Sequence, residues 1–395
     1  MFPFDLWGVF MGELRFMTAG ESHGPCLTAI LEGLPAGLSI DMEAVNADLA
    51  RRQQGYGRGG RMAIEKDKAE ILSGVRFGET LGGPMTLRVA NKDWENWTDR
   101  MAVMGSPTGP KVTAARPGHA DLTGYRKYAR QDVRDILERS SARETTMRVA
   151  VGAVCKQFLK AFGMKVVSHV TNIGGIAVDE EKIDRERIGK CESDLNCCDA
   201  EAEGKMKSRI REAKESGDTL GGIFEVVVRG VPLGLGSHIQ WDRRLDARLA
   251  SALMSIQAIK GVEIGAGFAC ANLPGSQVHD EMYLDDQGRV YRKTNRAGGL
   301  EGGMSNGEDI ILRAVMKPIP TLMQPLHSVD VESRKEVLAC KERSDTCAVS
   351  AASVVGEAMT AFVMAQALCE KFGSDAMVDV LAAFEAYGKR VRDDW

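Results

Sequence analysis

Two histidines stand in glycine-containing loops, where an imidazole could exchange a proton with a bound ligand. His23 follows Ser22 in the segment TAGESHGP, and His119 precedes Asp121 by two residues in RPGHAD. Glycine lets the backbone approach a ligand closely, and histidine is the side chain that titrates near neutral pH. Asp121 could orient the imidazole of His119 or turn toward the backbone, and the sequence favours neither. Both histidines are candidates for acid–base chemistry if other groups join them.

Four arginines crowd the segment RRQQGYGRGGR, which contains no acidic residue: Arg51, Arg52, Arg58 and Arg61. A guanidinium group binds phosphate or carboxylate through two parallel hydrogen bonds, so the segment predicts a site for an anion such as a phosphorylated carboxylic acid. A solvated basic turn is the alternative. The glycines also spell G-x-G-x-x-G, but they follow a helical stretch instead of a strand, which argues against a dinucleotide-binding turn.

A second candidate anion site lies in the segment ERSSARE. Ser140 and Ser141 can cap the helix that follows them. The N-terminus of that helix, together with Arg143, would attract an anion. Capping and ligand binding are compatible interpretations here.

The C-terminal third contributes three more candidate groups. The glycine-rich segment NRAGGLEGGMSNG is typical of backbone wrapped around a flat or phosphorylated ligand, and the MKPIPT segment after it offers Lys317 and Thr321. The segment RSDTCAV places Arg343 close to Asp345 at the start of a helix. An arginine near an aspartate usually forms a salt bridge, so this pair alone does not indicate catalysis.

Composition excludes several classes of protein. The chain has 395 residues, 51 Lys and Arg against 55 Asp and Glu, and 44% apolar residues, which argues against a disordered chain and a generally basic nucleic-acid binder. The sequence lacks H-E-x-x-H, G-x-x-x-x-G-K-[ST] and G-x-S-x-G motifs, and we expect no metal site. Nine cysteines occur without any C-x-x-C pair, and we expect them to be reduced. The near-apolar stretch 347–369 favours a core helix over a membrane span.

Hydrophobic periodicity indicates the elements that must position these groups. Apolar residues recurring at intervals of three and four predict helices over 41–54, 142–162, 245–259, 348–372 and 375–391. Strand-like runs lie between them at 165–170, 223–228 and 309–315. The charged segment 179–207, which holds three of the cysteines, indicates a surface excursion.

Two internal echoes predict a duplicated α+β unit. ETLGGPMTLRV at 79–89 resembles DTLGGIFEVVV at 218–228. ERSSARETT and ERSDTCAVS each open a long predicted helix that ends at Phe-Gly. Shared turn chemistry is the alternative explanation.

In chain order these segments resemble chorismate synthases of the bacterial type, from about residue 13 to the last predicted helix. The blocks that carry the resemblance are AGESHGP, RRQQGYGRGGRM, LSGVRFGETLGGP, RPGHAD, ERSSARET, GDTLGG, LDARLASALMSIQAIKGVEIGAGF, NRAGGLEGGMSNG, MKPIPT and RSDTCAV. The resemblance implies an α+β fold with helices sandwiched between antiparallel β-sheets, assembled into a homotetramer. Residues 1–12 would be an N-terminal extension and residues 13–395 a single domain.

The resemblance also implies an activity and its residues. The reaction is a lyase step of the shikimate pathway toward the aromatic amino acids, in which reduced FMN assists anti-1,4-elimination of phosphate from 5-enolpyruvylshikimate 3-phosphate to give chorismate. His23 would protonate the departing phosphate, His119 the reduced flavin, and Asp345 would be the acid–base partner of the flavin nitrogen that takes up the substrate's ring proton. Substrate binding would fall to Ser22, Arg51, Arg52, Arg58, Arg61, Arg143 and Arg343. FMN binding would fall to Arg139, Ser140, Ser141, Gln257, Ala258, Gly302, Lys317, Thr321 and Arg343.

The reductant of the flavin is either NADPH acting directly or a separate flavin reductase. No separate nicotinamide-binding unit is visible in the sequence, which favours the reductase as partner. We expect a cytoplasmic enzyme that binds a small molecule, with no membrane or nucleic-acid partner. The alternatives are an anion- or RNA-binding protein without catalysis and an NADPH-consuming flavin oxidoreductase.

Overall fold

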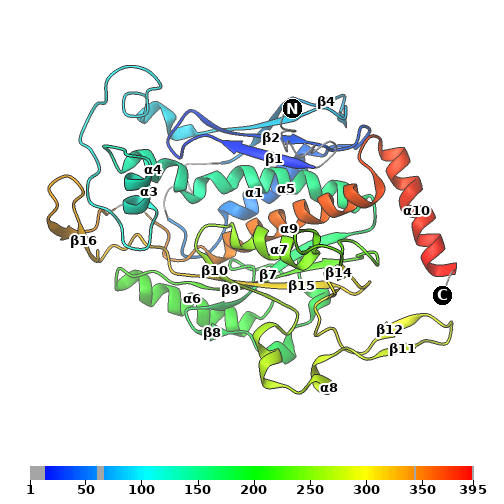
Figure 1. The fold of residues 1–395 in the computed structure, drawn as a ribbon. Coiled ribbons are helices and arrows are strands. Elements are labelled where there is room, and N and C mark those ends of the chain that lie inside the picture. The colour runs from blue at the N-terminus through cyan, green and yellow to red at the C-terminus, as the bar shows by residue number, and fades with distance from the viewer. Residues whose placement is uncertain (1–13, 60–65, 342–343, 394–395) are drawn as a thin grey trace, which may run out of the picture.

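Two antiparallel β-sheets form the outer layers of the molecule (Figure 1). The computed structural model describes residues 14–59, 66–341 and 344–393, and the expected N-terminal extension lies outside this part. The first sheet has the strand order β1 (Arg15–Ala19), β2 (Cys26–Glu32), β6 (Met85–Ala90) and β3 (Ala69–Ser73). The second sheet has the order β10 (Ile259–Ile264), β15 (Ile310–Met316), β9 (Gly222–Arg229), β7 (Lys165–Ile173) and β8 (Ile176–Ala177).

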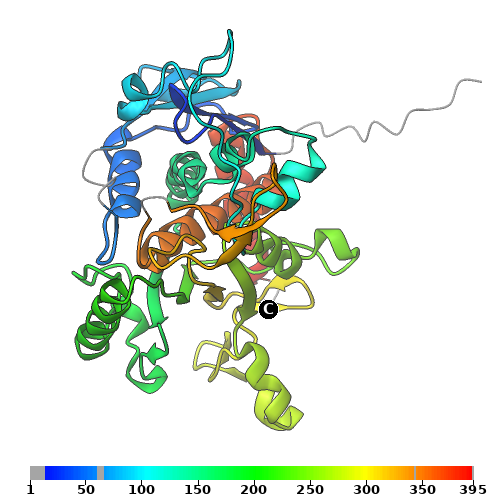
Figure 2. The ribbon, with the colours of Figure 1, turned by 90° about the vertical axis from the view of Figure 1, so that its left-hand side faces the viewer.

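Long helices fill the space between the sheets, and Figure 2 views this layer from one end. They are α1 (Met42–Gln53), α5 (Thr145–Lys160), α7 (Leu245–Met254) and α9 (Val349–Phe372), with α10 (Met377–Asp393) following at one end of the molecule. One continuous hydrophobic core joins both sheets to these helices. The predicted α+β sandwich is therefore confirmed.

Short elements complete the described chain. The strands are β4 (Val75–Arg76), β5 (Glu79–Thr80), β11 (Met282–Leu284), β12 (Val290–Arg292), β13 (Leu300–Glu301), β14 (Met304–Ser305), β16 (His327–Val329) and β17 (Glu336–Leu338). The α-helices are α3 (Asp121–Lys127), α4 (Arg134–Ser140), α6 (Ala200–Glu215) and α8 (Gly275–Val278). The 3-10 turns are η1 (Lys92–Asn96), η2 (Ala142–Glu144), η3 (Glu180–Lys182), η4 (Arg185–Arg187), η5 (Trp241–Arg243) and η6 (Gly267–Asn272).

Helix α9 is the centre of the core. It is long and apolar enough to cross a membrane, but it is almost entirely buried inside the protein, as the core-helix prediction requires. It packs against α5 at Gly152, where an added Cβ would lie only 2.3 Å from the Cβ of Ala358. Glycine at this position therefore lets the two helix backbones approach closely.

The two sheets share one connectivity. In the first sheet the strands lie side by side in the order β1-β2-β6-β3. Along the chain, α1 comes between β2 and β3, and α5 comes after β6. In the second sheet the order β7-β9-β15-β10 repeats this arrangement. Along the chain, α7 comes between β9 and β10, and α9 comes after β15. Neighbouring strands in both series are antiparallel. This repeated connectivity confirms the duplicated unit that the sequence predicted.

Only one of the two sequence echoes marks equivalent elements. ERSSARETT and ERSDTCAVS lead into α5 and α9, which occupy equivalent places in the two units. The TLGG segments lead into β6 and β9, which are the fourth strand of one unit and the second strand of the other. That echo is wrong as a sign of duplication, and turn chemistry accounts for it. Thr80 and Thr219 each donate a side-chain hydrogen bond to a backbone carbonyl, that of Pro35 and that of Ile319.

Helix boundaries follow capping and backbone constraints that periodicity does not register. Asp41 is the N-cap of α1, since its carboxylate accepts hydrogen bonds from the Glu43 and Ala44 amides. The helix predicted over 245–259 is too long, because α7 ends at Met254 and Ala258 has a left-handed φ of 67°. The chain turns there and enters β10 directly, so Ala258 belongs to a turn.

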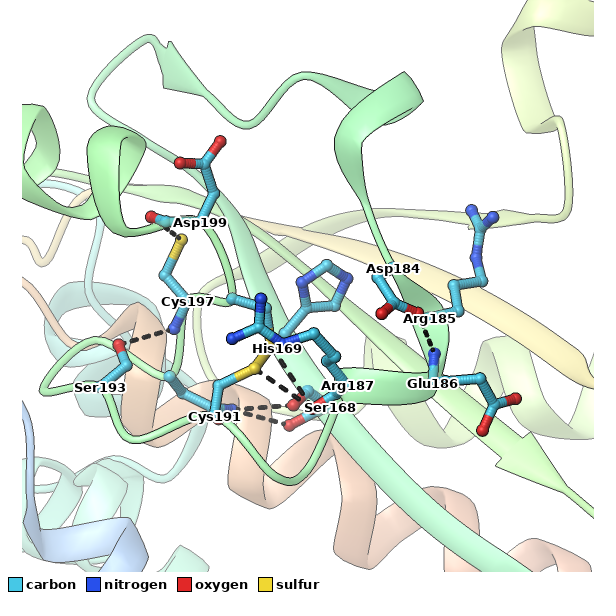
Figure 3. Close-up of a disulfide and its surroundings, with 12 residues drawn as sticks. Ser168, His169, Asp184, Arg185, Glu186, Arg187, Cys191, Ser193, Cys197 and Asp199 are labelled. Atoms are coloured by element: carbon cyan, nitrogen blue, oxygen red, sulfur yellow. Dashed lines mark hydrogen bonds between the residues drawn. A yellow bond between two sulfur atoms is a disulfide. The ribbon is translucent and has the colours of Figure 1, made fainter.

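The segment 179–207 is more ordered than the predicted surface excursion. Part of it covers the outer face of the second sheet, where Ile188 packs with Val167 and Val227. Figure 3 shows a disulfide within it between Cys191 and Cys198, whose Cα atoms are 5.5 Å apart. The expectation of reduced cysteines is wrong for this pair, because the loop brings the two residues to a separation typical of disulfides. The other seven cysteines, all within the described residues, are not in disulfides.

Candidate active site

A cavity of about 600 Å³ is lined by residues at the end of the helix layer near α4. In Figure 1 helices α3 and α4 lie on the left, and that side of the molecule faces the viewer in Figure 2. Loops from both duplicated units line it. It brings together the following predicted residues: Ser22, His23, Arg52, Arg58, His119, Ser140, Ser141, Arg143, Gln257, Ala258, Lys317, Thr321 and Asp345. Side chains distant in sequence thus share one chamber of the size that small-molecule ligands occupy.

His23 is held by a buried carboxylate. Its Nδ1 lies 2.9 Å from Oε1 of Glu138, and its backbone N–H donates to Oε2 of the same residue at 2.8 Å. Arg134 donates to Oε1 at 2.9 Å. Burial would raise the pKa of Glu138, but the hydrogen bonds from His23 and Arg134 bring it below its ordinary value. Glu138 was not among the predicted site residues, because it lies 115 positions from His23 in the chain.

His119 has a matching arrangement. Its Nδ1 lies 2.5 Å from Oδ1 of Asp121, and Arg116 donates from Nε to Oδ2 at 2.8 Å. Burial would raise the pKa of Asp121, but the hydrogen bonds from His119 and Arg116 hold it well below its ordinary range. Asp121 contacts the imidazole and also accepts a hydrogen bond from the backbone N–H of Arg116 at 3.1 Å, so both arrangements that the sequence left open occur together. Arg116 was missed as well, although its place three residues before His119 was a usable signal.

Two arginines converge on one carboxylate in the cavity wall. Arg143 donates from Nη1 to Oδ1 of Asp67 at 2.6 Å, and Arg52 donates from Nη2 to Oδ2 at 3.0 Å. Burial, together with the nearby charges of Arg143 and Arg58, lowers the pKa of Arg52 to about 10 against the attraction of Asp67. Nε of Arg52 is buried and has no hydrogen-bond partner in the described chain. The two guanidinium groups carry more positive charge than the single carboxylate of Asp67 balances, and this excess suits an anionic ligand.

Asp345 ties the arginine segment to the start of α9. Its Oδ1 accepts a hydrogen bond of 2.6 Å from the backbone N–H of Gly59, and Oδ2 lies 3.3 Å from Nε of Arg58. An added Cβ at Gly55 would lie 2.4 Å from Oγ of Ser350 on α9. Gly55 thus serves close packing against α9, and at Gly57 an added Cβ would lie 2.8 Å from the side chain of Ile210 on α6, so both glycines are explained by packing, in agreement with the rejection of a dinucleotide-binding turn.

Another part of the cavity wall has a hydrogen-bond acceptor that no described residue satisfies, Oε1 of Gln257. Gln257 donates from Nε2 to Glu144 at 2.9 Å, and its buried Oε1 has no hydrogen-bond partner in the part of the chain described. Lys317 donates to the carbonyl of Gly118, and Thr321 accepts from Arg116 at 3.1 Å. This wall could therefore accept an N–H group of a ligand at Gln257 and hold its anionic part near Lys317.

Some predicted residues do not line the cavity. Arg51 is turned away and makes two hydrogen bonds of 2.7 and 2.8 Å to the buried carboxylate of Glu357, because neighbouring positions on a helix point about 100° apart. Arg139 donates to the Thr18 and Gly20 carbonyls, and Gly302 lies in the turn between β13 and β14. Arg61 and Arg343 lie outside the described residues.

The fold and the cavity together define an enzyme for an anionic small molecule. A family model described as chorismate synthase matches residues 14–369. The chorismate synthase of Geobacter sulfurreducens is 57% identical over 390 residues, which cover 96% of this chain and 99% of that protein. The chorismate synthase of Aquifex aeolicus is 56% identical over 392 residues, covering 96% and 98%. A crystal structure of chorismate synthase matches with a TM-score of 0.78 and 47% identity, covering 96% of this chain and 99% of that one.

The chain belongs to the chorismate synthase family. It is accordingly a carbon–oxygen lyase of the shikimate pathway that acts on a small-molecule substrate. The non-catalytic alternatives weighed on sequence alone are set aside by this membership.

Proposed function

We propose that the cavity binds 5-enolpyruvylshikimate 3-phosphate beside reduced FMN and eliminates phosphate in the anti-1,4 sense to form chorismate. The observation that carries the proposal is the shared chamber, which places two carboxylate-bound histidines among buried arginines. The substrate has one phosphate and two carboxylates, and such groups match guanidinium donors. Arg52, Arg58 and Arg143 would hold these charges, and Arg61 and Arg343 remain predictions outside the described residues.

The proton steps fall to three side chains. His23 would give a proton to the departing phosphate, which makes it a better leaving group. His119 would protonate the flavin, and Asp345 is the proposed acid–base group for the ring proton that the substrate loses. Because Asp345 now pairs with Arg58 and Gly59, it would also hold the arginine segment over the substrate.

The residues present fit a flavin. The buried, unpartnered Oε1 of Gln257 matches an N–H donor, and Ala258 next to it has a left-handed backbone that gives a ligand close access. Lys317, Ser140, Ser141 and Thr321 would take part in holding the anionic side of the group. Reduced FMN, when bound, supplies the electron density that assists loss of phosphate without net redox change. Arg51 as a substrate ligand, and Arg139 and Gly302 as FMN ligands, stay predictions.

We propose a homotetramer in the cytoplasm, supplied with reduced FMN by a separate NADPH-dependent reductase. The outer face of the first sheet supports assembly, because Met17 and Ile30 pair across β1 and β2 and leave their side chains exposed. Disulfides are rare in reducing compartments, so the state of Cys191 and Cys198 in protein extracted under alkylating conditions tests the compartment.

The decisive experiment is anaerobic incubation of the protein with chemically reduced FMN and 5-enolpyruvylshikimate 3-phosphate. We expect phosphate and chorismate in equal amounts, with many turnovers per flavin and no NADPH in the mixture. Stoichiometric consumption of reductant would instead indicate a flavin oxidoreductase. Salt-sensitive RNA binding without chorismate would indicate the anion-binding alternative.

A further inference from the structure

Two side chains hold the imidazole ring of His23. Glu138 contacts the edge of the ring at Nδ1, and Trp97 stacks on its face. Both carboxylate oxygens of Glu138 lie within 3.0 Å of Nδ1. The ring stacks on Trp97 with centroids 3.9 Å apart and planes inclined by 29°. Trp97 is itself held, because its Nε1 donates to Asp93 at 2.9 Å and Arg134 lies 5.1 Å from its ring centroid.

Glu138 fixes more than the ring. The same carboxylate accepts the backbone N–H of His23 and the guanidinium of Arg134, so it joins the loop after β1 to α4. With Nδ1 engaged, any proton that His23 exchanges with a ligand passes through Nε2. The ring orientation and the reacting nitrogen therefore depend on one buried side chain.

We propose that Glu138 is a positioning residue that holds His23 in the orientation and charge state needed for proton transfer in the cavity. The inference rests on the proposed function, in which His23 is the proton donor. Glu138 does not touch the substrate cavity itself, and it acts only through His23 and Arg134.

The charges around His23 explain why a carboxylate is needed. Arg134 approaches from α4, and Arg52, Arg58 and Arg143 line the same cavity. Asp93 lies behind Trp97, and Glu138 is the carboxylate in direct contact with the imidazole. The carboxylate of Glu138 therefore lies in contact with both the imidazole of His23 and the guanidinium of Arg134.

The test compares Glu138→Gln with wild type. The amide keeps the shape but lacks the charge, so we expect kcat to fall roughly 10–10³-fold with little change in KM. The alkaline limb of the pH–rate profile should move to lower pH, because the imidazolium loses its counter-charge. Glu70→Gln, at an exposed ion pair with Arg88, is the matched control and should leave both quantities unchanged.

A second readout needs no turnover. Nitrogen NMR of histidine-labelled protein, with the His23 signals identified from a His23→Asn variant, should show a proton fixed at Nδ1 in wild type and a changed tautomer in Glu138→Gln. Unchanged NMR signals and an unchanged pH profile in an active enzyme would overturn the inference. A wild type that forms no chorismate would refute the proposed function, while the NMR comparison would still decide whether Glu138 positions His23.

If Glu138→Gln does not fold, Arg134→Gln provides a second test of the same inference. This variant removes a positive charge while the carboxylate remains, so the alkaline limb should move to higher pH, the opposite direction. A shift to lower pH, or none, would contradict a Glu138-controlled imidazole.

Discussion

Each cavity histidine has a carboxylate at Nδ1 and an arginine behind that carboxylate. We expect His23→Ala and His119→Ala to lower turnover by roughly 10²–10⁴-fold, the range for loss of a positioned acid or base. The fold should survive, because Glu138 keeps Arg134 and Asp121 keeps Arg116 as partners. Turnover with reduced FMN and the circular dichroism spectrum of each variant check this expectation, and wild-type turnover in either variant would contradict it.

Neighbouring arginines of one segment should respond differently to substitution. Arg58→Ala should weaken substrate binding by roughly 1.5–3 kcal/mol, the contribution of a charge-assisted hydrogen bond. Arg51→Ala should instead lower the free energy of unfolding by about 2–4 kcal/mol, because it leaves Glu357 buried with Lys156 as its remaining cation. Calorimetric titration and urea unfolding measure the two effects. Equal binding by Arg58→Ala and wild type would show that the segment is only a basic surface.

Contacts between predicted site residues could be anticipated from the sequence where the residues are close along the chain. His119 and Asp121 are two positions apart, so their pairing was already a stated alternative. The Glu138 contact to His23 and the Asp67 contact to Arg143 span 115 and 76 positions and depend on tertiary packing. Periodicity and motif spacing contain no record of such contacts. The same limit applies to Arg51, whose side chain direction is set by its rotation on α1.

Close packing of α5 and α9 can be tested by adding a single methyl group. At Gly152 a new Cβ would meet the backbone of Ala358 at 2.4 Å, so Gly152→Ala should destabilise the protein by about 1–3 kcal/mol through overpacking. The matched control is Gly204→Ala on α6, where no atom lies within 4 Å of the added Cβ. That change should stabilise the protein by about 0.5–1 kcal/mol, because alanine favours the helix. Urea unfolding of both variants measures the difference, which should have opposite signs.

The core elements were predictable because their periodicity is strong. The five predicted helices and three predicted strands all exist, with shifts of a few residues at their ends. The exception is the region after Met254, where a left-handed residue ends the helical pattern earlier than its apolar spacing suggests. The disulfide and the buried residues within 179–207 could not be inferred, because charged composition conceals the few side chains that pack.

Low pH should lower the free energy of unfolding, because Glu357 is a buried carboxylate between α1, α5 and α9. Burial would raise the pKa of Glu357, but Lys156 and Arg51 bring it down from 4.5 to about 2. A depressed pKa in the folded state means stability that is present above pH 4.5 and lost as the pH falls toward 2. The unfolding free energy should therefore decline over this window, and less steeply in Glu357→Gln. Glu201→Gln, at an exposed pair, should follow wild type.

The first ten residues pose a question about the whole assembly. Their apolar side chains lie outside the described residues, and the family match begins at residue 14. Deleting residues 1–10 should leave turnover near wild type while changing solubility or the stability of the proposed tetramer, because apolar extensions dock on protein surfaces. Sedimentation and turnover of the truncated protein measure both. Lost catalysis in an intact tetramer would show that the segment reaches the active site.

The two duplicated units, or copies, contribute different residues to the cavity. The histidines and the described arginines of the cavity come from the first copy, whereas Gln257, Lys317 and Asp345 come from the second. Each copy covers its own sheet with helices that pack against those of the other, as α5 does with α9. An ancestral chain of half this length would have needed a twin to close its core. Joining two such units in one chain lets a single cavity draw on both copies, with the two histidines from the first and Gln257, Lys317 and Asp345 from the second.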